Sequence, residues 1–227
     1  LTRPGTERFR GQASFNFNDE ALNGRNPFSE EKTRPALQTR QYGGNFGGPL
    51  VKGKASFFVD FDKRDIDDAA LVVARVLDAN NNIVDFTATA PTPSRRTSFS
   101  PRIDYQLNPN HTLIARYNYT KNTRITGVGG FSLPSRAYDT EQDEQSIQLT
   151  ETAIINKTIV NETRFQFIRN RNYQTSVFDA FFLNVLDSFS GGGSQIGSAT
   201  DARDRYELQN FTSWTSGNHF LKVGARL

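Results

Sequence analysis

Two histidines, His111 and His219, are the side chains of this 227-residue chain best suited to proton transfer near neutral pH. Each follows an asparagine and precedes an apolar segment, in the sequences Asn-His-Thr-Leu and Asn-His-Phe-Leu. A general base needs a second group that orients it, and no base–orienter pair accompanies either histidine. The repeated context favours two equivalent turns, so we predict no catalytic residue and no enzymatic activity.

Metal and phosphate sites are disfavoured by spacing as well. The chain has no cysteine, and nothing near the histidines supplies the other ligands that zinc needs. Residues 78–82 resemble the start of a calcium loop, but Ile83 replaces the required glycine and Thr89 the bidentate glutamate. The glycine-rich run 43–48 lacks the spacing and the following helix of a phosphate-binding loop. We therefore predict no metal and no cofactor, and we interpret the glycines as places where another backbone approaches closely.

Composition narrows the class of protein further. A net charge of +3 is too small for a nucleic-acid-binding chain, which carries a clustered basic excess. No run of about 18 apolar residues is present, so a transmembrane helix is excluded. The chain contains no Met, starts at Leu1 without a signal-peptide pattern and ends in a strand-like segment. These features predict an internal piece of a longer protein.

A two-residue alternation runs through most of the chain. In segment 8–18, the odd positions are apolar or small and the even positions are polar. Similar patterns occur in segments 41–50, 56–62, 98–107, 113–119, 147–155, 162–167 and 221–227, and they predict strands with one apolar and one polar face. Segment 206–214 is also strand-like, but Leu208 and Phe211 differ in parity, which leaves its apolar face undecided. About nine strands result, mostly of about 9–11 residues, which is the length of a tilted membrane-spanning strand.

The connections between these strands alternate in length. Short turns at 51–54, 108–111, 156–158 and 216–219 contain Gly, Pro or Asn, which supply turn dihedrals. Long polar segments lie between them, at 19–39, 64–97, 121–144 and 172–203. This alternation is typical of outer-membrane barrels, which have short periplasmic turns and long outer loops. We predict an all-β fold, an incomplete antiparallel up-and-down transmembrane β-barrel, with residues 1–227 forming one partial barrel domain.

Two of the long segments, 64–97 and 172–203, contain patterns of their own. Segments 71–76 and 83–89 flank an Asn-rich turn and predict a projecting hairpin. Segment 190–194 predicts a flexible tip, and segment 178–185 is apolar and fits either a short helix or a stretch that packs on a plug. Four aromatic residues of the predicted outer loops are candidates for stacking on a ligand: Tyr138, Tyr173, Phe178 and Phe181.

Charged side chains gather on the polar face of the predicted strands. The candidates for facing the lumen are Arg10, Asp60, Arg102, Asp104, Arg116 and Arg164. They form either a solvated, salt-bridged wall or part of the electric field along a transport path.

Residues 41–58 resemble an early barrel hairpin of TonB-dependent receptors, in particular of the Oar-like subgroup. The resemblance is carried by a glycine-rich strand, the step Gly48-Pro49-Leu50, a lysine turn at 52–54 and the pair Phe57-Phe58. Segment 23–28 is similar to the first outer loop of that subgroup. Segment 218–224 is similar to a later hairpin that is usually written Leu-Lys-Phe-Gly, with Val223 in place of the phenylalanine. The resemblance extends over residues 8–63 and 97–227.

The resemblance implies a barrel of about 22 strands with an N-terminal plug, in the outer membrane of a Gram-negative bacterium. Such a receptor imports a scarce nutrient of the siderophore, oligosaccharide or peptide class. The implied partners are outer-membrane lipid, a transported small ligand and the TonB energy-coupling complex, which acts through an N-terminal part that this sequence lacks; no nucleic acid is implied. Two alternatives stay open: a structural or adhesive surface barrel without transport, and a soluble all-β ligand-binding sandwich.

Overall fold

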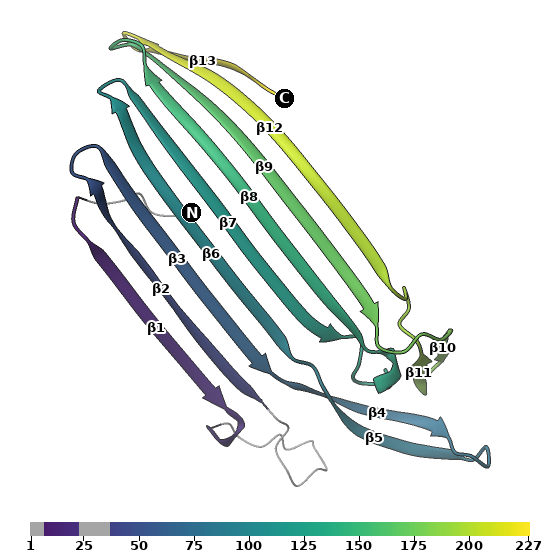
Figure 1. Cartoon of the computed structure of the whole chain (residues 1–227). Coiled ribbons are helices and arrows are strands. Elements are labelled where there is room, and N and C mark those ends of the chain that lie inside the picture. Colours follow the sequence, from purple (N-terminus) through teal and green to yellow (C-terminus); the bar gives the residue numbers. More distant parts are fainter. Residues whose placement is uncertain (1–6, 23–36) are drawn as a thin grey trace.

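A computed structural model describes residues 7–22 and 37–227 of the chain. One antiparallel sheet of nine strands dominates it, in the order β1-β2-β3-β6-β7-β8-β9-β12-β13 (Figure 1). The strands are β1 (Arg10–Asp19), β2 (Gln38–Val51), β3 (Ala55–Asp67), β6 (Ser94–Asn108), β7 (His111–Thr126), β8 (Tyr138–Ile154), β9 (Ile159–Ser176), β12 (Ala199–Ser216) and β13 (His219–Arg226). The predicted nine-strand, up-and-down order is confirmed.

Smaller elements occupy the connections at one end of the sheet. The hairpin β4 (Ala69–Leu77) and β5 (Ile83–Pro91) joins β3 to β6, and the hairpin β10 (Phe182–Val185) and β11 (Phe189–Gly192) joins β9 to β12. Two 3₁₀ turns, η1 (Glu20–Leu22) and η2 (Pro134–Arg136), follow β1 and precede β8. The four short turns all lie at the opposite end (Figure 1). Local residue type determines the conformation of two of these turns, because Gly53 and Gly217 adopt φ of 69° and 56°, which favour glycine.

The strands are longer than the sequence pattern predicts. Seven of them have between 13 and 18 residues: β2, β3, β6, β7, β8, β9 and β12. The excess lies at the long-loop end, where the strands continue pairing through segments predicted as loops. The predicted loops 64–97, 121–144 and 172–203 are therefore too long, and only residues 68–93, 127–137 and 177–198 leave the main sheet. Most of the predicted loop 19–39, including the segment 23–28, lies outside the described residues.

The register sorts the side chains of every main strand onto two faces. Directly opposed residues share a face, and the pairs Phe46–Val59, Phe57–Ile103 and Phe61–Phe99 join the apolar positions of β2, β3 and β6. The same face continues through Ala115–Leu149 and Leu149–Phe165. The register also settles which face of segment 206–214 is apolar. Leu208 lies on the apolar face because it opposes Phe165, whereas Phe211 opposes Glu162 on the other face.

The apolar face ends in a change of residue type at the long-loop end of the sheet. Toward the long loops, Tyr42 opposes Lys63 and lies near its ammonium group, which is 5.9 Å from the ring centre. Tyr119 is followed on its face by Lys121, and Phe167 by Arg169, whose guanidinium lies 5.8 Å from the Phe167 ring. The apolar positions therefore form a band across the sheet, which we call the apolar band. Its extent on β9 is Ile159 to Phe167, and on β12 it is Tyr206 to Trp214.

No second layer formed by residues 7–22 or 37–227 covers the apolar band. Phe15 is 66% exposed and Phe46 is 50% exposed, and the buried apolar residues are small ones such as Ala55 and Ala153. A sandwich needs a second sheet packed on this face, so the single layer rules out the soluble sandwich alternative.

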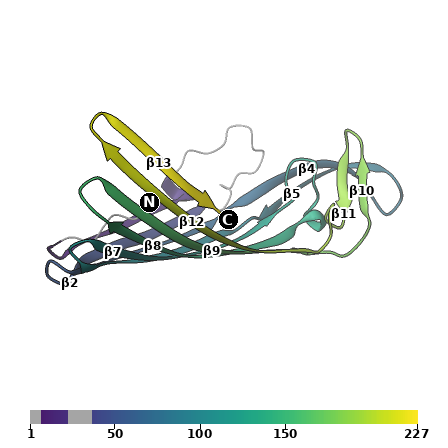
Figure 2. The same cartoon turned by 90° about the horizontal axis from the view of Figure 1, so that it is seen from above.

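The sheet is open along both edges within the described residues. β1 pairs only with β2, and β13 pairs only with β12. The sheet is curved, and the β12–β13 hairpin rises out of the level of β7 to β9 (Figure 2). An open, curved sheet with two unpaired edges is the form expected for part of a larger barrel.

Candidate functional site

The six charged residues predicted to share one face do share it. In the register, Arg102 opposes Phe58 on one side and Arg116 on the other. Phe58 also opposes Gly47, which opposes Arg10, so Arg10 lies on the same face. Arg164 opposes Thr150, which belongs to the same face, and Asp60 opposes Ser100. We call this side of the sheet the polar face.

Two ion pairs organise the middle of the polar face. The Arg102 Nε atom donates a hydrogen bond to Asp104 Oδ2 at 2.9 Å, and Arg102 is only 6% exposed. Arg164 Nη2 lies 3.1 Å from Glu162 Oε1. Both pairs join residues two apart on one strand, which side-chain alternation places on the same face. These arginines are therefore held by carboxylates of their own strands.

A hollow lies farther toward the long loops, at the ends of β6, β7, β8, β9 and β12. Its volume is about 570 Å³. Polar side chains line most of it, and those on the polar face are Ser94, Asn122, Arg124, Thr140, Gln142, Asn172, Gln174 and Asp201. No sequence motif marks this site, because its members come from five strands.

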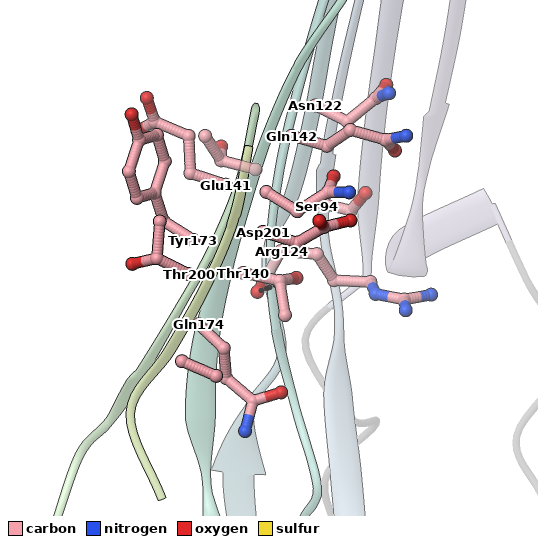
Figure 3. A pocket seen from close by; sticks show the side chains of 13 residues that line it. Ser94, Asn122, Arg124, Thr140, Glu141, Gln142, Tyr173, Gln174, Thr200 and Asp201 are labelled. Carbon is pink, nitrogen blue, oxygen red and sulfur yellow. Dashed lines mark hydrogen bonds between the residues drawn. The ribbon is translucent and has the colours of Figure 1, made fainter. Parts of the chain in front are cut away.

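The register arranges the hollow in two rows. Asn122 opposes Gln142, which opposes Asn172, which opposes Asp201. We call these residues the amide row. The second row contains Ser94, Arg124, Thr140 and Gln174. Asn122 and Gln142 point to one side of the ribbon, and Glu141 and Tyr173 point to the other (Figure 3).

The two rows differ in their internal hydrogen bonding. In the second row, Thr140 Oγ1 donates to the Arg124 carbonyl at 3.1 Å, and Gln174 Nε2 donates to the Gly197 carbonyl at 2.8 Å. Within residues 7–22 and 37–227, the side-chain amides of Asn122, Gln142 and Asn172 have no protein hydrogen-bond partner. The amide row therefore keeps its donors and acceptors for solvent or for a ligand.

Of the four predicted ligand-loop aromatics, the structure brings only Tyr173 to the hollow. It lies on β9 and borders the hollow from the side opposite to the amide row (Figure 3). Tyr138 is the first residue of β8, where its ring packs beside Gly127. Phe178 and Phe181 lie in the β9–β10 connection, and Phe181 is 97% exposed. The four aromatics therefore do not form one cluster.

The connections at this end are tied to one another by backbone hydrogen bonds. Val73 N–H of β4 donates to the Gly130 carbonyl at 2.9 Å, and Leu133 N–H donates to the Ser190 carbonyl at 2.9 Å. Arg75 N–H completes the link from β4 by donating to the Ser188 carbonyl at 3.2 Å. The three connections 68–93, 127–137 and 177–198 thus form one joined outer layer.

Two expectations for these connections are corrected. Segment 190–194 is not a free tip, because Ser190, Gly191 and Gly192 pair with β10 and Ser194 is buried. Residues 182–185 of the apolar segment form a strand and not a helix. The Arg136 guanidinium lies over the Phe182 ring, 4.2 Å from its centre, and burial lowers the pKa of Arg136 from its ordinary value.

The predicted hairpin is confirmed as β4 and β5, and its turn explains the Asp-Asn pattern. The Asp78 carboxylate accepts hydrogen bonds from the N–H groups of Asn80 and Asn82, both at 2.8 Å. These bonds hold the pKa of Asp78 below its ordinary value, and the largest cause is the N–H of Asn82. Asn81 takes the left-handed conformation that asparagine tolerates, with φ of 64°. The carboxylate thus serves the turn.

Neither histidine lies at the hollow, since both begin strands at the short-turn end. In the described part of the chain, no three His, Cys, Asp or Glu side chains are grouped as a metal site would require. The described residues also include no helix long and apolar enough to cross a membrane.

Comparison with known proteins agrees with this architecture. The family model described as "Outer membrane beta barrel domain" matches residues 1–92 and 63–227. No curated protein sequence matches the chain.

Two solved structures share the fold at low sequence identity. The outer membrane transporter YddB from Escherichia coli has a TM-score of 0.61 at 12% identity, over 84% of this chain and 25% of that one. The siderophore receptor PirA from Acinetobacter baumannii has a TM-score of 0.63 at 14% identity, over 99% of this chain and 30% of that one. This chain therefore spans between a quarter and a third of the length of these barrels.

The family match covers the whole chain, and the nine strands superpose on part of a larger receptor barrel. The chain therefore belongs to the outer membrane beta barrel domain family and forms part of a barrel in the outer membrane of a Gram-negative bacterium.

Proposed function

We propose that the chain is part of the barrel wall of a TonB-dependent receptor that binds a scarce nutrient and imports it, without making or breaking covalent bonds in it. The apolar band faces lipid and the polar face lines the lumen. The single observation that carries this proposal is the sorting of side chains by face through all nine strands.

The energetics of a bilayer support this orientation. A charged side chain on the lipid face costs about 2–4 kcal/mol near the midplane. The polar face bears Arg102, Asp104, Arg116 and Arg164 at the level of the apolar band, so it is the face unsuited to lipid. Aromatic residues at both ends of the band, such as Tyr42 and Trp214, fit the girdles of outer-membrane barrels.

The six charged residues then have a role in the lumen. Arg10, Asp60, Arg102, Asp104, Arg116 and Arg164 form a hydrated wall in which Asp104 and Glu162 hold two of the arginines. This wall keeps the interior polar along the path that a ligand takes.

Ligand recognition is assigned to the outer layer and the hollow. Long connections on a rigid scaffold are where binding residues usually lie. The mutual hydrogen bonds of the three connections give the outer layer a defined shape, and the hollow adds unpaired amides below it. The ligand class, siderophore, oligosaccharide or peptide, comes from the sequence resemblance.

Nitroxide labels at successive positions from Ser98 to Leu107 test the orientation in outer-membrane vesicles. We expect collision with oxygen, which dissolves in lipid, to be high at Phe99, Ile103 and Tyr105. It should be low at Ser100, Arg102 and Asp104. Equal accessibility at odd and even positions would overturn the assignment of faces.

Import is tested on intact cells that display the protein. Radiolabelled ferric siderophores, oligosaccharides and oligopeptides are offered with and without an uncoupler of the inner-membrane proton gradient. Accumulation of one ligand class that the uncoupler abolishes supports energy-coupled import. Surface binding without accumulation would instead support the adhesive barrel, whose binding element would be the β4–β5 hairpin with its exposed Val73, Leu77 and Ile83.

A further inference from the structure

A group of three arginines lies on the polar face next to the amide row. Arg64 of β3 opposes Arg96 of β6, and Arg96 opposes Asn122, the first member of the amide row. Arg124 is two residues beyond Asn122 on β7 and therefore lies on the same face, diagonal to Arg96. We call Arg64, Arg96 and Arg124 the arginine cluster.

The arginine cluster lacks the carboxylate partners that the other arginines of this region have. Among residues 7–22 and 37–227, no carboxylate lies within ion-pair distance of Arg64, Arg96 or Arg124, and all three are exposed. Asp62 lies two residues before Arg64 on the same face, and its Oδ2 accepts a hydrogen bond from Gln41 Nε2 at 3.0 Å. On the opposite face, Arg40 and Arg95 at the same level both pair with Asp67.

Placing like charges directly opposite one another on a sheet is unfavourable. The arrangement is stabilised when an anion bridges the guanidinium groups, which present planar donor pairs suited to a carboxylate. An anion here would lie at one end of the hollow. The other end is closed by Asp201. Its carboxylate lies 3.8 Å from Arg203 Nη2 in an exposed ion pair, and it repels a second anion.

We infer that the hollow binds an extended ligand with a carboxylate at one end and uncharged hydrogen-bonding groups along its length. The carboxylate binds Arg96 and Arg124, the uncharged body binds the amides of Asn122, Gln142 and Asn172, and a donor at the far end binds Asp201. Four strand spacings separate Arg96 from Asp201, roughly 19 Å. This length matches about six residues of extended peptide, or a short neutral oligosaccharide that ends in one uronic acid.

This inference rests on the proposed function, because it names the ligand class of the same receptor. The test measures binding to the protein in outer-membrane vesicles. The probes are the peptide Ser-Gly-Ser-Gly-Ser-Gly with a free C-terminal carboxylate, the same peptide as its C-terminal amide, and a neutral trisaccharide that ends in one uronic acid, with the methyl ester of that acid. The two probe pairs show whether a peptide or a sugar acid is the source of the carboxylate.

The wild-type protein should bind at least one of the two acids about ten- to a hundredfold more tightly than its uncharged partner. The variant R96Q/R124Q should lose that preference. The control R75Q removes an exposed arginine of β4 that lies outside the hollow and should keep the preference. The variant R96K keeps the charge, loses the planar donor pair and should weaken binding of the acid. It replaces the double variant in the test if R96Q/R124Q does not reach the outer membrane.

Equal binding of acid and uncharged probes by the wild type, or an unchanged preference in R96Q/R124Q, would overturn the inference. A measurement of uptake separates a failure of this inference from a failure of the proposed function. Energy-dependent import without a carboxylate preference refutes the inference alone. A carboxylate preference without energy-dependent import supports the inference and refutes the proposal of import.

Discussion

His111 Nδ1 lies 2.7 Å from Glu151 Oε1, so the two residues form a hydrogen bond between neighbouring strands at the short-turn end of the apolar face. Glu151 shares that face with Leu149 and opposes Leu113. A carboxylate in this position conflicts with a lipid environment unless it has a partner and lies near water. The pair therefore fits the periplasmic boundary of the apolar band, and His111 has a structural role.

The first prediction concerns this pair. We expect His111→Ala and Glu151→Gln each to lower the free energy of unfolding by less than about 1 kcal/mol, because both side chains are partly exposed. A double-mutant cycle measured by urea unfolding in lipid vesicles should give a coupling of a few tenths of a kcal/mol or more. A coupling of zero would show that the two residues do not stabilise one another.

The second prediction compares two neighbouring residues on opposite faces. Phe57→Arg puts a charge on the apolar band and should lower the free energy of unfolding by about 2–4 kcal/mol. Ser56→Arg is the matched control, since Ser56 opposes Asp104 on the polar face and an arginine there meets water and a carboxylate. Similar losses in the two variants, measured by unfolding in vesicles, would contradict the assignment of the faces.

The third prediction concerns a glycine that makes room for an aromatic ring. A Cβ atom at Gly48 would clash with Cδ1 of Phe9, whose ring stacks on Phe46 with centres 5.9 Å apart. Gly48→Ala should displace the Phe9 ring and cost about 1 kcal/mol of stability, which is the range of one aromatic pair.

The variant Phe9→Ala, which removes the displaced ring, checks this explanation of the Gly48→Ala loss. In a Phe9→Ala background, Gly48→Ala should cost almost nothing, because the ring that it displaces is already absent. Full additivity of the two losses would mean that the glycine is required for another reason, such as backbone approach.

The fourth prediction concerns acid at the tip of the β4–β5 hairpin. The pKa of Asp78 is lowered by hydrogen bonds that only the folded turn provides, chiefly that from the Asn82 N–H. The stabilisation is therefore complete above the ordinary pKa of about 3.9 and is lost as the pH falls through the lower folded value. The carboxyl carbon of Asp78, followed by NMR, should titrate below 3.9. Asp78→Ala should abolish the protection of the Asn82 amide from hydrogen exchange.

Much of this fold is determined by local sequence alone. The alternation at 8–18 or 98–107 assigns side chains to faces because the side-chain period of a strand is two, whatever the strand pairs with. Turn residues such as Gly53 and Gly217 fix the short connections for an equally local reason. The hairpin at 69–91 was predictable because both of its strands and its Asp-Asn turn are contiguous in the sequence.

Other features depended on which strands lie side by side. Segment 121–124 is polar on both faces, so its sequence resembles a loop, yet it continues as a strand because β6 and β8 pair with it on either side. The face of Leu208 was settled only by its register with Phe165, and the partner of Glu151 only by the approach of His111.

The hollow and the joined outer layer belong wholly to the tertiary structure. The amide row takes Asn122, Gln142, Asn172 and Asp201 from four strands, and no spacing in the sequence links them. The bonds from Val73 to Gly130 and from Leu133 to Ser190 likewise join connections far apart in the chain. The sequence determined which side chains each strand presents to each face, because that is a property of one strand. The tertiary structure decided which of them meet, because strand register and loop contacts depend on partners distant in the sequence.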